Sequence, residues 1–155
     1  MILPAMTLTL LLLSAVATDD PAGHAAGVDA RGDHAMGFDH TKTTHHFLLT
    51  DTGGEINVSA NDEADPASRD HIRQHLRQVA SMFTAGDFSL PMFIHDKMPP
   101  GATAMKQAGA KITYAYDDTP KGARVVLRTD DKEALAAIHD FLRFQIQDHR
   151  TGDPQ

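Results

Sequence analysis

The most specific pair of possible ligands in the sequence is His71 and His75. They are four residues apart, and on a helix this spacing puts both imidazoles on one face, about 6 Å from each other. Helices that supply two ligands to one metal ion use this spacing. A zinc-protease motif would need Glu at position 72, where the sequence has Ile72, so a metalloprotease is not predicted. The alternative is a pair of solvated polar side chains.

A second group of possible ligands lies between residues 32 and 47 and consists of His34, Met36, His40, His45 and His46. Imidazole with thioether suits copper, and imidazole alone suits copper or zinc. Strand alternation puts His45 on the face of Phe47 and His46 on the opposite face. His45 is therefore the preferred third ligand for the helix pair, and His46 the second choice. The alternative is a solvated linker in which these histidines bind nothing.

The remaining histidines carry weaker signals. His95, between Met92 and Met98, offers a possible copper site, but the favoured interpretation is that its apolar neighbours pack under a loop while His95 points outward. His139 falls in an apolar helix row and is predicted to hydrogen-bond to backbone or to a carboxylate. His149 continues that row about 15 Å further along the helix, so these two cannot share one ion. Asp140 and Asp148 are expected to be solvated helix charges.

The composition limits the function classes further. The chain has 155 residues, enough for one ordinary domain, with ten His, no Cys and no Trp. The net charge of −7 argues against nucleic-acid binding and against a polybasic membrane patch. Without Cys there is no thiolate zinc site and no thiol nucleophile. Serine-hydrolase, phosphate-loop and dinucleotide motifs are also absent from the sequence.

The first 17 residues are typical of an export signal. They are apolar and end in Ala15-Val16-Ala17, the small-x-small pattern that signal peptidase cleaves. We therefore expect a soluble periplasmic or secreted protein. Residues 18–41, rich in Gly, Ala, Asp and His, are predicted to form a flexible arm, residues 42–150 a single domain and residues 151–155 a disordered tail.

The domain pattern predicts an α+β fold with two ββα units. Residues 46–60 and 112–128 each indicate a hairpin, and each is followed by an amphipathic helix, the first capped by Asp65 and the second by Asp130 with Glu133. We expect one four-stranded, mainly antiparallel sheet with both helices on one face. Residues 87–110 are predicted to be a loop-rich crossover with at most a short helix over 103–108.

Several motifs together resemble a family of small, exported, uncharacterised, His-rich bacterial proteins. They are a His-x-Met-Gly-Phe-Asp run from His34, the Thr-Thr-His-His-Phe motif over 43–47, Ile-His-Asp over 94–96, and the segment from His139 to His149. The resemblance covers nearly the whole chain after residue 17. It implies a bacterial periplasmic setting and no catalytic assignment.

The sequence thus favours an exported protein that binds copper or zinc for capture, buffering or a metal-dependent reaction. His71 and His75 would form the core of the site, and His45 or His46 would complete it. One alternative is a metal-free module that binds a ligand or partner and uses histidines to respond to pH. Another is an enzyme, such as a hydrolase, with His45, His46 or His95 as general base. The sequence leaves the oligomeric state open.

Overall fold

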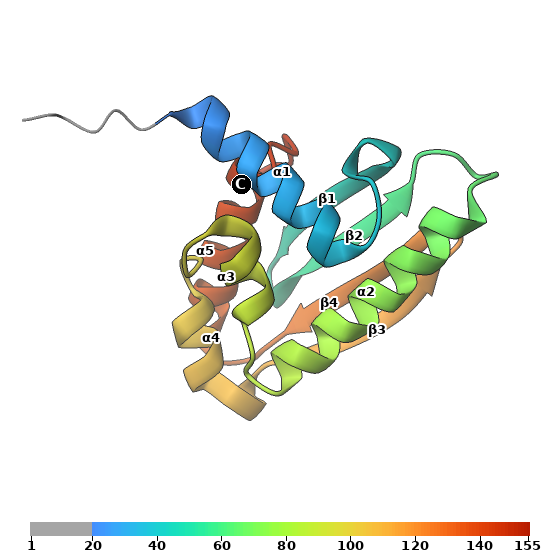
Figure 1. Cartoon of the computed structure of the whole chain (residues 1–155). Coiled ribbons are helices and arrows are strands. Elements are labelled where there is room, and N and C mark those ends of the chain that lie inside the picture. Colours follow the sequence, from blue (N-terminus) through green and yellow to red (C-terminus); the bar gives the residue numbers. More distant parts are fainter. Residues whose placement is uncertain (1–19) are drawn as a thin grey trace, which may run out of the picture.

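The computed structural model describes residues 20–155, so the expected export signal lies outside the described residues. The chain forms an α+β fold with one four-stranded sheet and five α-helices (Figure 1). The strands are β1 (Thr43–Thr50), β2 (Gly53–Ala60), β3 (Thr113–Thr119) and β4 (Gly122–Arg128). The helices are α1 (Pro21–Met36), α2 (Pro66–Thr84), α3 (Ser89–His95), α4 (Ala102–Ala108) and α5 (Lys132–Asp148), with short 3₁₀ turns η1 (His40–Lys42) and η2 (Gly109–Lys111).

The sheet is antiparallel throughout, in the order β1-β2-β4-β3. Both predicted hairpins are present, and β2 and β4 join them at the centre of the sheet. Phe47 of β1 lies opposite Ile56 of β2, which in turn lies opposite Val125 of β4. All three are buried, so the register forms a continuous apolar row across the three strands.

The two long helices follow their sequence signals closely. Asp65 caps α2, since its carboxylate accepts a hydrogen bond from the backbone N–H of Ser68 at 3.0 Å. The cap of α5 is Asp131 rather than the expected Asp130, because Asp131 accepts from both Glu133 N and Ala134 N. The apolar residues of both helices join one core cluster with the sheet; the largest fully buried among them are Ile72, Leu76, Ile138, Phe141 and Leu142.

The segment predicted to be a flexible arm contains helix α1, which lies beside α3 (Figure 1). The helix has little apolar character, but Val28, Gly32 and Met36 recur every four residues and are all buried. Polar contacts also hold it: Arg31 Nε donates to the carbonyl of Ile94 at 2.8 Å, and Arg150 donates to Asp29 at 2.7 Å. Composition alone did not reveal this packing.

The crossover and the C-terminal tail are also more ordered than the sequence indicated. Within 87–110 the chain forms α3 as well as the expected short α4. In the tail, the carboxylate of Asp153 accepts from the Phe47 backbone N–H at 2.9 Å and from His46 Nδ1 at 2.7 Å, which ties residues 151–155 to β1. None of the helices within residues 20–155 has the length and apolarity that crossing a membrane requires.

Candidate metal centre

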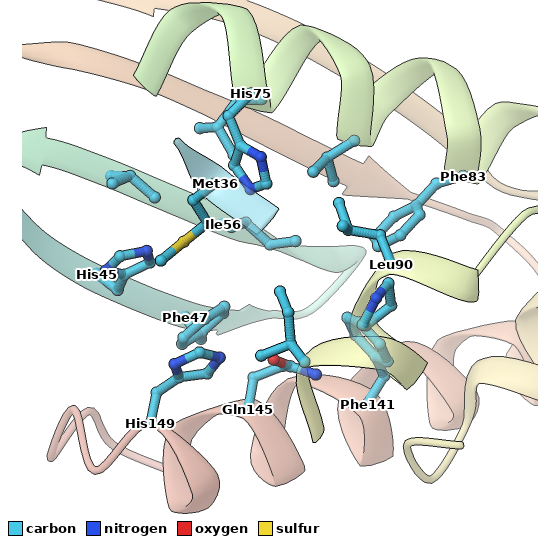
Figure 2. A pocket seen from close by; sticks show the side chains of 15 residues that line it. Met36, His45, Phe47, Ile56, His75, Phe83, Leu90, Phe141, Gln145 and His149 are labelled. Carbon is cyan, nitrogen blue, oxygen red and sulfur yellow. The ribbon is translucent and has the colours of Figure 1, made fainter. Parts of the chain in front are cut away.

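A small cavity of about 60 Å³ lies between the sheet, α2, α3 and α5 and holds the candidate site (Figure 2). Most of its wall is apolar, and Phe47, Ile56, Phe83 and Phe141 contribute to it. The side chains with lone pairs on this wall are Met36, His45, His75, Gln145 and His149. Three imidazoles and a thioether therefore share one apolar cavity.

Strand β1 brings His45 to the cavity and turns His46 away, as the alternation predicts. His45 lines the cavity beside Phe47. His46 is exposed and donates to Asp153 on the other side of the strand. The sheet thus separates two adjacent histidines into one site residue and one surface residue.

Helix α2 separates His71 from His75 in a similar way. His75 is 8% exposed and lines the cavity, one position before the core residue Leu76. His71 is exposed and lies one turn nearer the N-terminus of the helix. Both face an outer hollow of about 310 Å³, which His34 and Gln78 also line. The structure therefore brings His75 together with His45, and places His71 with His34 outside the cavity.

The cavity also contains two residues that sequence reasoning missed, Gln145 and His149. With Phe141 they form a row at i, i+4 and i+8 on one face of α5 and the residue that follows it. Figure 2 shows all three side chains directed toward the cavity. The spacing of four residues was visible in the sequence. His149 was assigned to the same helix row as His139, however, and was therefore not counted among the possible ligands. In the structure His139 instead donates to the backbone carbonyl of Thr50 at 2.9 Å, as predicted.

Aromatic rings enclose the three imidazoles. The rings of His45 and His149 are nearly parallel, at 6°, with their centroids 5.7 Å apart. Phe38 contacts both His45 and His75, at centroid distances of 6.2 and 5.8 Å. Phe47 stacks on His149 at 5.5 Å. These contacts pack the faces and edges of the rings and do not use their nitrogen lone pairs.

The same burial keeps the three imidazoles uncharged at neutral pH. Desolvation lowers the pKa of His45 and of His75 from 6.5 to about 4. Desolvation, helped by the nearby His45 and His95, lowers the pKa of His149 to about 3, although Asp148 opposes this shift. No side-chain hydrogen bond contributes to these shifts. A neutral imidazole whose nitrogen lone pair accepts no hydrogen bond is in the form that binds a metal ion.

Behind the cavity, a chain of hydrogen bonds runs from the surface to Gln145. His24 Nε2 donates to one oxygen of Asp148 at 2.9 Å, and His95 Nδ1 donates to the other at 2.5 Å. The opposite nitrogen of His95, Nε2, is 2.9 Å from Gln145 Oε1. His95 is 1% exposed, so the expectation that it points outward was wrong; Met92 and Phe93 are the exposed residues of α3. Asp148, expected to be solvated, is 11% exposed.

The chain of hydrogen bonds leaves one polar atom of Gln145 unused. Gln145 is 4% exposed, and its Nε2 has no hydrogen-bond partner among residues 20–155. A buried amide without a partner costs free energy, about 1–3 kcal/mol. Desolvation lowers the pKa of His95, while Asp148 and Gln145 raise it.

A tighter group of possible ligands lies on the surface near η1. Within residues 20–155, the one group of three or more His or carboxylate ligands whose atoms all lie within 4.8 Å of one another is Asp33, Asp39 and His40. These groups already have local hydrogen-bond partners, and Asp39 caps η1. Asp33 accepts from His40 Nδ1 and from the His40 backbone N–H, and Asp39 accepts from Thr41. The cluster is explained by local structure, and His40 lies outside the cavity.

The three cavity histidines do not form so tight a group. Because they are absent from that 4.8 Å grouping, binding one ion through all three requires their side chains to rotate toward the cavity. The cavity volume of about 60 Å³ is far below the roughly 300–1,000 Å³ that drug-sized ligands need. The site is therefore sized for an ion or a very small molecule.

Comparisons of the chain with protein-family models, with curated proteins and with solved structures found no match.

Proposed function

We propose that this protein binds one transition-metal ion in the cavity between β1, α2 and α5, with His45, His75, His149 and Met36 as ligands. The observation that carries the proposal is that three uncharged imidazoles, none with a side-chain hydrogen bond among residues 20–155, line one small apolar cavity. A structural histidine normally uses its ring nitrogens, as His95 and His139 do. Free lone pairs in an apolar wall favour a ligand-binding role.

The donor set favours copper over zinc. Met36 is 8% exposed and lines the cavity, and a thioether is a soft ligand that selects Cu(I). An apolar shell with little water also favours Cu(I), which needs fewer ligands and carries less charge than Zn(II). We therefore propose a Cu(I) site in an exported protein, with capture or buffering of the metal as its role, and zinc as the second candidate metal.

The other functions considered from the sequence have less support. A pH response between 5 and 7 would need titration in that range, whereas the pKa values of His45 and His75 are about 4. A general base must reach its substrate, but His95 is 1% exposed and lies behind Gln145. The small cavity at His45 leaves little space for an organic substrate.

We also propose that β1–β2–α2 and β3–β4–α5 act as two ββα units with both helices on one face of the sheet. The support is the cavity wall, where Leu76 of α2 and Phe141 of α5 meet Phe47 of β1. Nuclear Overhauser contacts from Phe47 to both helix residues are expected. A protein in which only one helix contacts Phe47 would contradict this arrangement.

The function is tested by metal analysis of the natively purified, tag-free protein, followed by Cu(I) titration against a chromophoric chelator. We expect one Cu(I) per chain. His149→Ala should weaken binding, and His139→Ala, a matched control on α5, should leave it unchanged. A protein that arrives metal-free, and whose affinity for added Cu(I) and Zn(II) is the same in both variants, would contradict the proposed function.

A further inference from the structure

The outer hollow on the α2 side of the cavity contains two histidines that the proposed site does not use. His34 of α1 and His71 of α2 are both exposed and line this hollow of about 310 Å³. The hollow shares two wall residues with the cavity, Met36 and His75. Two exposed imidazoles therefore lie on one side of a wall built from two proposed ligands of the inner site.

We infer that His34 and His71 form an outer metal-binding site that captures the ion and passes it through His75 and Met36 into the cavity. The inference rests on the proposed function for its destination, although the outer site itself depends on different residues. His71 and His75 are one helical turn apart, so an ion held by His71 can reach His75 before it is released. Each step then replaces one protein ligand by another, so that the ion keeps at least one protein ligand throughout the transfer.

Exposure determines how strongly each site holds the ion. His34 and His71 stand in solvent, where water competes for the metal, so binding there is weak and reversible. His75 is buried and His45 and His149 are half-buried in an apolar wall, and among residues 20–155 none of the three has a side-chain hydrogen bond. This gradient of affinity directs the ion inward. The net charge of −7 also favours the approach of cations.

A second opening adjoins the same cavity but suits a cation less well. This second hollow, of about 220 Å³, is lined by His40 and Arg150, and it shares Met36, His45 and His149 with the cavity. The guanidinium of Arg150 repels an approaching metal ion, and the nearby carboxylate of Asp29 is already engaged by that guanidinium at 2.7 Å. His40 donates to Asp33. The α2 side is therefore the preferred route, and His40 provides a matched control.

The route is tested by following Cu(I) transfer from a chromophoric chelator by stopped-flow absorbance. In the His34→Ala/His71→Ala variant we expect loading to slow at least about tenfold, because capture at an outer site makes the second step intramolecular. The equilibrium affinity should stay within about threefold, since the inner ligands are intact. His40→Ala should load at the wild-type rate. Unchanged loading in the double variant, or slower loading in His40→Ala, would overturn the route.

The outer site is also tested without the inner one. In the His45→Ala/His149→Ala variant, ¹⁵N-histidine NMR with added Cu(I) should show shifts at His34, His71 and His75 with weak, fast-exchanging binding. Such shifts would support the outer site even if the inner site failed. A wild-type protein that binds Cu(I) tightly, combined with no response of His34 and His71 in this variant, would overturn the outer site and leave the proposed function standing.

Discussion

Two neighbouring groups of histidines in this molecule differ in their hydrogen bonding. His24 and His95 both donate to the carboxylate of Asp148. His45, His75 and His149 face an apolar cavity and have no side-chain hydrogen bond within the part of the chain that the structure describes. The ring of His149 is only 5.0 Å from that of His95, centroid to centroid. The contrast shows that the partner of an imidazole, rather than its burial, separates a structural histidine from a candidate ligand.

The largest expected effect separates the two groups by metal affinity. The His45→Ala/His75→Ala variant should bind Cu(I) about 10⁴-fold more weakly, since loss of even an outer-shell partner costs about 10–100-fold and a direct ligand costs at least as much. His24→Ala/His46→Ala removes two surface histidines and should change the affinity less than about threefold. Competition with a chromophoric chelator measures both. If both double variants lose the same amount of Cu(I) affinity, the distinction between the cavity histidines and the paired histidines is wrong.

The next effect concerns the stability of the paired group. His95→Leu removes one of the two hydrogen-bond partners of Asp148, which keeps His24, and removes the hydrogen bond to Gln145. It should lower the free energy of unfolding by about 3 kcal/mol, since two polar groups of low exposure each lose a hydrogen bond worth roughly 1–3 kcal/mol. His139→Leu loses bonds only to backbone carbonyls and should cost about 1 kcal/mol. Urea unfolding at pH 7 measures both. A cost for His95→Leu no larger than that for His139→Leu would show that the Asp148 network does not stabilise the fold.

Acid should destabilise the protein through the unpaired group. A pKa of about 4 for His75 in the folded protein, against 6.5 unfolded, means that the unfolded chain takes up a proton first, so stability falls as pH drops from about 6.5 to 4. The fall should be about 3 kcal/mol for this residue. The carboxylates whose pKa is lowered, such as Asp148, lose their contribution mainly below that range. Urea unfolding at pH 7 and pH 4.5 should therefore give a smaller loss in His75→Leu than in wild type.

Exposed His71 on the same helix is the control for the acid experiment. His71→Leu should keep the wild-type loss of stability between pH 7 and pH 4.5, because it leaves the buried His75 in place. If His75→Leu and His71→Leu lose stability equally, the burial of a neutral His75 is contradicted.

The smallest effect belongs to the pair of His46 with Asp153. The His46 side chain is 49% exposed and that of Asp153 is 8% exposed. His46→Ala should change stability by less than about 1 kcal/mol, because Asp153 keeps its hydrogen bonds from the Phe47 N–H and Thr151 Oγ1. A thermal melt at pH 7 measures this. A larger loss would mean that the C-terminal tail stabilises β1 through His46 rather than through the bond from Asp153 to the Phe47 N–H.

The sequence predicted the elements whose apolar pattern is regular. Both hairpins and α5 followed from their apolar period, and α2 from its period and its Asp65 cap, whereas the cap of α5 is Asp131 and not the expected Asp130. Helix α1 did not, because its buried face consists of Val28, Gly32 and Met36 and has too little apolar surface to stand out. Its position depends on contacts with α3 and with Arg150, which are far away in the sequence.

The site was predicted only in part, for a related reason. Alternation placed His45, and helical spacing drew attention to His75, but spacing alone could not show that His71 faces solvent one turn away. His149 needed the tertiary structure, since its approach to His45 joins residues at opposite ends of the domain. Long-range packing, rather than motif spacing, assembles the three imidazoles.

The central claim is that one metal ion binds the three cavity histidines and does not bind the histidines that are hydrogen-bonded to other groups. Residue-resolved ¹⁵N-histidine NMR with Cu(I) tests this most directly. At one equivalent, the ring signals of His45, His75 and His149 should shift together, while those of His95, His139 and His46 keep their positions. Shifts confined to other histidines, or spread evenly over all ten of the chain, would contradict the account.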